Sequence, residues 1–260
     1  MDSVYMISTA KRFAAVPLLL LAMGCVEAPN DARAPVTSAS FSDNVNTLAP
    51  GSGTSATGTI TETETATGTR KVRTVPPPKL FDQAFRDASA QKHAADIAKL
   101  RQAFLNLGPG VDPEEAARAA RVVYTYVDQL VIEYQIEDSS PLAHNTKVNF
   151  GQKPRGLCWH WAHDLDIRLQ MERFKTLEIH RAIANYNNLR LEHSTTILGR
   201  RGDRMEDSIV LDPWRNAGEL FWEIVRKDTR YNWTPRDEVF AYKRAQKKRD
   251  AEEEEFNSPI

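Results

Sequence analysis

The stretch CWHWAHDLDIRL, residues 158–169, begins the part of the chain that decides its fold. Cys158, Trp161, Leu165 and Leu169 recur at steps of three and four residues, which places them on one face of a helix. The stretch therefore predicts a helix that begins at Cys158 and buries this face against the neighbouring structure.

Runs of alternating apolar residues follow this helix and predict a small antiparallel sheet. The first run covers residues 177–183, and the second covers residues 189–197 with His193 on its apolar face. A charged turn then leads to a short third strand at 208–211, which ends at Asp212-Pro213-Trp214. We expect the strands to lie next to one another, with the helix packed on them.

Helices are also predicted before this region, and a long loop follows them. Apolar residues at helical spacing over 97–107 predict one helix, which Gly108-Pro109-Gly110 ends. Asp112, with Glu115 three residues later, predicts the capping box of a second helix. The polar stretch 137–155 shows little periodicity and is expected to be a long loop, of the kind that is often functional.

The C-terminal part predicts two more helices, one around residues 220–225 and one capped by Thr234. The charged tail, residues 247–260, is expected to fray. The fold class is therefore α+β, with a helix packed on a small antiparallel sheet and two or more helices before it. The expected domain spans residues 79–246.

The chain before this domain has the composition of a leader and a linker. Lys11 and Arg12 precede an apolar run within residues 1–25, which predicts a signal peptide and is too short to span a bilayer. Residues 26–78 are rich in Ala, Thr, Ser, Gly and Pro and contain few large apolar residues. Such a segment cannot bury enough surface to offset the entropy of ordering, so we expect a disordered tether.

The end of the signal, Leu21-Ala22-Met23-Gly24-Cys25, resembles the lipobox of bacterial lipoproteins. The resemblance implies that Cys25 carries a diacylglycerol and anchors the exported protein to the periplasmic face of the cell envelope. Val26, rather than aspartate, follows the cysteine, which favours the outer membrane. An ordinary cleaved signal with an incidental cysteine is the alternative.

Charge and cysteine content exclude several classes of function. The 260 residues carry 34 basic and 35 acidic side chains and a net charge of -1, so nothing favours a nucleic-acid partner. Two cysteines cannot build a disulfide scaffold. His144, His160, His163 and Asp164 are the candidate metal ligands, but their pattern lacks the ligands and base of a zinc hydrolase. We therefore expect neither a metal nor another cofactor.

Cys158 is the candidate nucleophile. It follows Gly156 at a predicted helix N-terminus, where the helix dipole stabilises a thiolate. His193 on a later strand is placed to take the thiol proton, and Asp212 on the next strand would orient that histidine. Each residue also has an ordinary explanation, as a small buried side chain, a core histidine or a turn cap. Their order along the chain favours a Cys-His-Asp triad.

At these residues the sequence resembles the transglutaminase-like branch of the papain-like cysteine enzymes, over residues 151–214. That family places its cysteine at the start of a helix packed on an antiparallel sheet, and its histidine on a following strand. Its acid lies in a motif like Leu211-Asp212-Pro213. The resemblance implies that Cys158 is the nucleophile, His193 the general base and acid, and Asp212 the orienting carboxylate.

Two further positions match the papain pattern. Gln152 precedes the cysteine and Trp159 directly follows it, which implies that the Gln152 side chain and the N–H of Cys158 stabilise the oxyanion. All five tryptophans lie after the cysteine. The upstream tryptophan that donates to the oxyanion in animal transglutaminases therefore has no counterpart here.

The expected function is that of a cell-envelope thiol hydrolase or acyltransferase, which acts on amide bonds through a thioester intermediate. The expected partners are protein substrates or cell-wall peptides, and the membrane through the N-terminal lipid. Hydrolysis is favoured over transfer to an amine because it needs no second binding site. The alternative is a non-catalytic envelope lipoprotein that uses the same fold as an interaction module.

Overall fold

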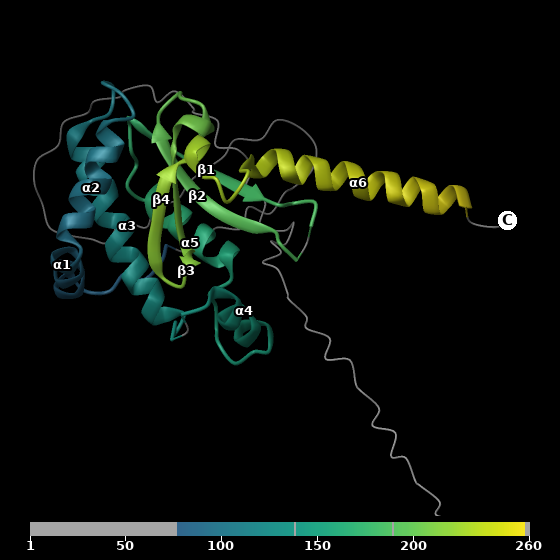
Figure 1. Cartoon of the computed structure of the whole chain (residues 1–260), viewed down its shortest axis with the longest axis horizontal. Helices are drawn as coiled ribbons and strands as arrows, with labels where there is room; N and C mark the ends of the chain where they lie inside the picture. Colours follow the sequence, from purple (N-terminus) through teal and green to yellow (C-terminus); the bar gives the residue numbers. More distant parts are fainter. Residues whose placement is uncertain (1–76, 138, 189, 258–260) are drawn as a thin grey trace, which may run out of the picture. The chain divides into compact units, whose positions relative to one another are not determined.

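The computed structural model describes residues 77–137, 139–188 and 190–257, which contain six α-helices and a five-stranded antiparallel sheet (Figure 1). The predicted α+β class, with helices before the sheet, is confirmed. The signal peptide, Cys25 and the tether up to residue 76 lie outside the described residues. Within the described ranges, no helix has both the length and the apolar content needed to cross a membrane.

The first three helices of the domain pack against one another. They are α1 (Gln83–Lys92), α2 (Ala94–Leu105) and α3 (Pro113–Glu133). The predicted apolar face of α2 is confirmed at Leu100 and Phe104, which are both 0% exposed. These side chains join the main apolar core, which α3 shares with the helix that begins at Cys158.

The cap of α3 is confirmed, but its predicted capping box is wrong. The Asp112 carboxylate accepts the backbone N–H groups of Glu114 and Glu115, both at 2.9 Å. The Glu115 carboxylate instead accepts the backbone N–H groups of Lys175 at 2.7 Å and Thr176 at 2.8 Å. Glu115 therefore fastens α3 to the residues that lead into the sheet.

The loop predicted for residues 137–155 is wrong in its middle, where α4 (Pro141–Asn149) forms. Ser140 caps this helix through its side-chain oxygen. The buried side chains of α4 are His144 and Asn145, both of them polar. Because both buried residues of α4 are polar, the sequence lacks the hydrophobic periodicity from which a helix is predicted.

The sheet has the strand order β4-β3-β2-β1-β5, and its pairings are antiparallel. β2 and β3 are therefore interior strands, each hydrogen-bonded on both sides. The strands are β1 (Leu177–Ala184), β2 (His193–Arg200), β3 (Ile209–Asn216), β4 (Glu219–Ile224) and β5 (Thr234–Pro235).

Helix α5 (Cys158–Gln170) packs on one face of the sheet and begins at the predicted residue. The four residues of its predicted inner face are at most 1% exposed, so that face is confirmed. The hydroxyl of Thr196 on β2 donates to the carbonyl of Ala162 at 2.7 Å, which fixes α5 against the interior of the sheet.

The extents predicted for two strands are wrong. β2 begins at His193, whereas Leu191, which was expected on its apolar face, lies in the preceding turn and is 60% exposed. β3 does not stop at residue 211 but passes through Pro213 to Asn216. The register of β3 with β4 is irregular between Asp212 and Asn216, where a proline is tolerated because the hydrogen-bond ladder is interrupted.

The helix predicted around residues 220–225 is wrong, since these residues form β4 and a short 3-10 helix (Val225–Lys227). Ala217 and Gly218 connect β3 to β4 with φ values of 52° and 98°. Two positive φ angles are what a two-residue hairpin turn of this kind requires. Leu220, Trp222 and Ile224 then alternate onto the main core, a period of two rather than of a helix.

The predicted last helix is confirmed as α6 (Arg236–Asn257), but its predicted cap is wrong: Thr234 and Pro235 form β5, and the helix begins at Arg236. The tail that was expected to fray from residue 247 continues this helix to Asn257. Its buried residues are Arg236, Val239 and Phe240, all in the first two turns. Beyond them α6 extends away from the sheet (Figure 1).

Candidate active site

The residues before Cys158 are held in place by two histidines. The Nδ1 atom of His160 accepts the backbone N–H groups of Gly156 at 3.1 Å and Leu157 at 3.2 Å, at the start of α5. Gly156 has φ +122°, and a Cβ there would collide with the ring of His144. This close approach requires glycine and fixes the direction from which the chain enters the helix.

His160 accepts both bonds because its ring is neutral. Burial, together with Arg155 and His163, lowers the pKa of His160 to about 3. A neutral ring whose Nδ1 accepts must carry its hydrogen on Nε2. His160 is therefore a structural histidine of the helix start.

His193 and Asp212 are brought together by the register of β2 and β3. Thr196 lies opposite Leu211, so Asp212, one residue further, falls on the strand face that carries His193. The Nε2 atom of His193 lies 2.7 Å from Oδ2 of Asp212, and the two residues are 2% and 1% exposed. The structure thus forms the histidine–carboxylate pair that the sequence spacing predicted.

The sulfur of Cys158 lies against the backbone on both sides of His193. The N–H of Ser194 points at the sulfur at 3.5 Å, and the sulfur is 4.0 Å from the carbonyl oxygen of Glu192. The Nδ1 atom of His193 is buried and has no hydrogen-bond partner among the described residues. Since Nε2 is committed to Asp212, Nδ1 is the ring nitrogen that remains for a thiol proton.

Asp212 is held as a carboxylate. Although burial pushes its pKa upward, the contacts with His193 and Arg215 hold the pKa of Asp212 below its usual value. An ionised Asp212 accepts the Nε2–H of His193 and so selects the tautomer whose Nδ1 is a base. The pair is therefore in the protonation state that deprotonation of a thiol needs.

Aromatic rings cover this group. The ring centroids of Trp214, Tyr231 and Trp233 lie 4.5, 4.7 and 5.3 Å from that of His193. Burial raises the pKa of Tyr231, and Cys158 acts in the same direction, so the thiol is within electrostatic reach of this ring. Cys158 itself is 0% exposed.

Gln152, the fourth predicted site residue, does not join the His193–Asp212 pair. It lies in the exposed turn after α4, where its backbone N–H donates to the carbonyl of Lys147 at 2.8 Å. Its side chain makes no hydrogen bond with any described residue. Asn145, in α4, does reach the rings around His193. Its side-chain oxygen accepts the indole N–H of Trp214 at 3.0 Å.

Several residues of the site were not found from the sequence. Arg215, three residues after Asp212, had a signal in the chain, since a charged residue on a buried strand needs a partner. Tyr231 and Trp233 had none, because they lie in an irregular segment that contacts His193 only in the folded chain.

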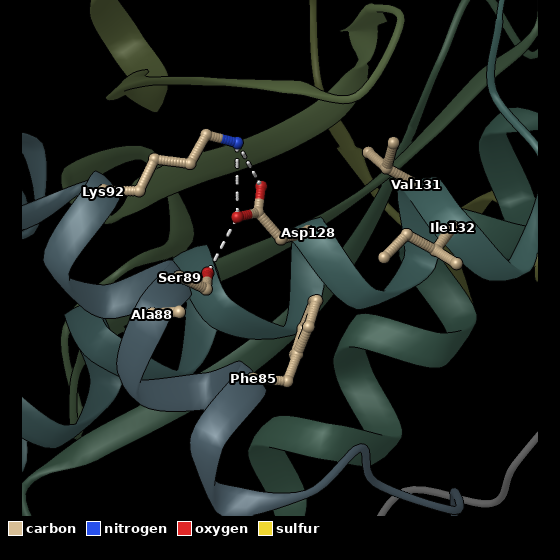
Figure 2. Close-up of a pocket in the computed structure, with 7 residues that line it drawn as sticks. All are labelled: Phe85, Ala88, Ser89, Lys92, Asp128, Val131 and Ile132. Atoms are coloured by element: carbon tan, nitrogen blue, oxygen red, sulfur yellow. Dashed lines mark hydrogen bonds and ion pairs between the residues drawn. The ribbon is translucent and has the colours of Figure 1, made fainter.

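A separate pocket of about 320 Å³ lies between α1 and α3 (Figure 2). Its Asp128 carboxylate accepts the hydroxyl of Ser89 at 2.8 Å and pairs with Lys92 at 3.3 Å and His93 at 3.0 Å. None of the three triad residues lines it. The lining residues are Phe85, Ala88, Ser89, Lys92, Asp128, Val131 and Ile132.

The candidate metal ligands do not converge. The described part of the chain contains no group of three or more His, Cys, Asp or Glu side chains that could hold a metal ion. His144, for example, places its Nε2 atom 2.8 Å from the carbonyl oxygen of Arg155. Comparison of the chain with protein-family models, with curated proteins and with solved structures finds no match.

Proposed function

We propose that the domain is a thiol hydrolase or acyltransferase acting on amide bonds, with Cys158 as nucleophile, His193 as general base and acid, and Asp212 as orienting carboxylate. The observation that carries the proposal is the buried 2.7 Å contact between His193 and Asp212, with the sulfur against the backbone on both sides of that histidine. A thiol, an imidazole with an uncommitted nitrogen and a carboxylate are the three groups that such a reaction needs.

In the first half of the reaction, Nδ1 of His193 takes the thiol proton and the thiolate of Cys158 attacks the amide carbonyl carbon. The tetrahedral intermediate then collapses with cleavage of the C–N bond. The amine leaves with the proton returned by His193, and the acyl group stays on sulfur as a thioester. Asp212 stabilises the imidazolium that exists between these two proton transfers.

In the second half, His193 removes a proton from water, and the resulting hydroxide attacks the thioester carbon. The C–S bond breaks, the carboxylic acid leaves, and the proton restores the thiol. A primary amine in place of water gives a new amide by the same steps. We favour water because it needs no acceptor site.

The arrangement also supports the resemblance to the transglutaminase-like branch of the papain-like enzymes. A cysteine at the first residue of a helix, a histidine on an interior strand and an aspartate on the adjacent strand follow that family's order. We further propose that the protein is a lipoprotein anchored through Cys25 on the periplasmic face of the cell envelope, at the outer membrane. Its substrates would then be envelope proteins or cell-wall peptides.

The test is the pH dependence of alkylation at Cys158. In a Cys25→Ser background Cys158 is the single thiol of the chain, and a thiolate–imidazolium pair predicts iodoacetamide labelling already at pH 6. An unperturbed thiol ionises at about 8.5, so labelling that begins only above about pH 8 would contradict the proposal. Asp212→Asn should move the labelling midpoint upward, because the imidazolium loses its anionic partner.

A non-catalytic interaction module is the second candidate function. The full burial of the Cys158 sulfur is the observation that favours it, since a substrate must reach a nucleophile. A thiol that labels slowly at every pH, in a domain that remains folded, would support this candidate.

A further inference from the structure

Arg215 joins the candidate triad to a second carboxylate. Its Nε atom donates to Oδ2 of Asp212 at 3.0 Å, and its backbone N–H donates to Oδ1 at 3.2 Å. Its two terminal nitrogens donate to Oδ1 and Oδ2 of Asp228 at 3.1 and 2.6 Å. The side chains of Arg215 and Asp228 are only 4% and 2% exposed, so the pair is shielded from solvent.

Asp228 also fixes the segment that covers the site. We define the aromatic cover as residues 228–233. This segment connects the 3-10 helix Val225–Lys227 to β5. The Asp228 carboxylate accepts the indole N–H of Trp233 at 2.9 Å and the backbone N–H of Arg230 at 3.1 Å. It therefore binds both ends of the cover to Arg215.

Tyr231 lies in the middle of the cover, against the imidazole and the guanidinium. Its ring centroid is 4.7 Å from that of His193, and the guanidinium carbon of Arg215 lies 4.8 Å from the Tyr231 centroid. The ring centroid of Trp233 lies 5.2 Å from that of Tyr231, with the two planes tilted by 49°. The guanidinium of Arg215 thus contacts both the Asp212 carboxylate that pairs with His193 and the Tyr231 ring that packs against His193.

We infer that the Arg215–Asp228 pair is a positioning device that couples closure of the aromatic cover to alignment of the His193–Asp212 pair. The inference rests on the proposed thiol chemistry at Cys158. When the cover is closed, Asp228 balances the charge of Arg215, and Asp212 accepts from both Arg215 and His193. When the cover opens to admit an acyl group, Asp228 moves away from Arg215. The guanidinium then keeps only Asp212 of its two carboxylate partners, and it competes more strongly with His193 for that carboxylate.

The residue types fit this role. Arginine binds one carboxylate through both terminal nitrogens while its Nε binds another, which lysine cannot do. Breaking a buried pair by removing one partner leaves an uncompensated charge, so the open and closed states differ sharply in their interactions. The charged and titratable groups around His193 include Asp212 and Arg215 from β3, Tyr231 and Asp228 from the cover, and Cys158 from α5. The adjacent buried Glu192 pairs with Lys243 of α6.

The experiment uses the full chain with Cys25→Ser and measures the iodoacetamide rate at Cys158 from pH 5 to pH 10. Asp228→Asn should raise the rate above pH 9 by about tenfold or more, because a cover that is no longer tied down opens more often. The same variant should raise the labelling midpoint by about one pH unit, because Arg215 then competes for Asp212. A purely structural role of Asp228 would not move the midpoint.

Two further variants keep the test decisive. Tyr231→Ala removes the ring next to His193 but keeps every hydrogen bond among Asp212, Arg215 and Asp228. It should raise the rate across the range, with a midpoint closer to that of the parent than in Asp228→Asn. Asp203→Asn breaks an Arg–Asp pair in the exposed β2–β3 turn, where Arg200 and Asp203 lie 2.6 Å apart, and should match the parent throughout. Circular dichroism confirms that each variant is folded.

The outcomes separate the two proposals. Parent-like rates and midpoint in both Asp228→Asn and Tyr231→Ala would overturn the coupling. A parent midpoint of about 8.5 would overturn the thiolate pair itself, whatever the variants do. Faster labelling of Asp228→Asn without a midpoint shift would support residues 228–233 as a cover of the site. It would contradict the coupling of this cover to Asp212.

Discussion

The guanidinium of Arg155 lies 2.8 Å from the carboxylate of Asp164, which joins the segment before Cys158 to the second turn of the helix that Cys158 begins. The same carboxylate accepts the phenol hydroxyl of Tyr134 on α3 at 2.6 Å. Asp164 therefore links three parts of the chain at the N-terminal end of α5. The sequence had suggested Asp164 only as a candidate metal ligand.

Asp164→Asn should destabilise the fold. Tyr134 is 0% exposed, so a poorer acceptor for its hydroxyl and the loss of the Arg155 pair should cost about 1–3 kcal/mol. The urea midpoint, with an unchanged slope, measures this loss. Asp96→Asn breaks the exposed pair with Lys99 on α2 and should change stability by less than about 0.5 kcal/mol. Equal effects in the two variants would contradict the role assigned to Asp164.

His160 should make the fold less stable as the pH falls. In the folded protein its pKa is about 3, whereas in the unfolded chain an imidazole takes up a proton at about 6.5. Because the unfolded state binds more protons in this window, stability decreases from about pH 7 towards pH 4. His180 acts in the same direction, since burial also lowers its pKa.

The measurement is urea unfolding at pH 7 and pH 5 for the parent and for His160→Phe. The variant loses the acceptor of two backbone N–H groups and should be less stable at pH 7. It should also lose less stability between the two pH values. A ring of His160 whose NMR signals titrate between pH 7 and pH 5 in the folded protein would contradict the prediction.

Glu115→Gln should loosen the connection between α3 and the sheet. The glutamate accepts two backbone N–H groups and the hydroxyl of Thr176, so a neutral amide should cost about 2–4 kcal/mol at pH 7. Burial raises the pKa of Glu115, but these bonds outweigh it and hold the pKa below its usual value. The contribution is therefore complete above the usual pKa and is lost as the pH falls through the lowered one.

The difference in the free energy of unfolding between Glu115→Gln and the parent should accordingly become smaller at acid pH. Glu114→Gln, in the same helical turn but exposed, is the matched control and should change stability by less than about 0.5 kcal/mol. A gap that stays constant down to pH 2 would show that the carboxylate charge is not what holds the segment.

Cys25→Ser should release the protein from membranes, because it removes the atom that would carry the lipid. Fractionation of cells into soluble and membrane material measures this directly. Cys158→Ser is the control and should remain in the membrane fraction with the same domain fold. Membrane association of Cys25→Ser would remove the lipoprotein proposal without affecting the site.

The sequence predicted those elements whose burial follows a simple period. The buried face of α5 and the pairing of His193 with Asp212 could be predicted because apolar residues recur there at the regular spacing of a helix or a strand. α4 could not, since its inward side chains, His144 and Asn145, are polar. β4 was mistaken for a helix because Leu220, Phe221 and Ile224 fit three-and-four spacing, although Leu220, Trp222 and Ile224 fit alternation equally well.

The parts of the site that depend on the folded chain were out of reach. Glu115 has the spacing of a capping box, yet its carboxylate accepts the backbone N–H of Lys175, which lies 60 residues later in the chain. Gln152 matches a family pattern by position, but the turn after α4 leaves it exposed. Tyr231 reaches His193 across 38 residues of chain, from 193 to 231, and no local pattern indicates such a contact.

The strand order gives the two halves of this site different resistance to local opening. His193 pairs with Ala184 of β1 and Asp212 with Phe221 of β4, within strands that are interior to the sheet, whereas the cover is anchored downstream by the two-residue edge strand β5. Amide hydrogens of the interior strands should therefore exchange with solvent only through global unfolding, and those of residues 228–233 through small fluctuations. Opening of the cover alone would thus expose the sulfur many times over the lifetime of one folded molecule, without separating the two strands that carry His193 and Asp212.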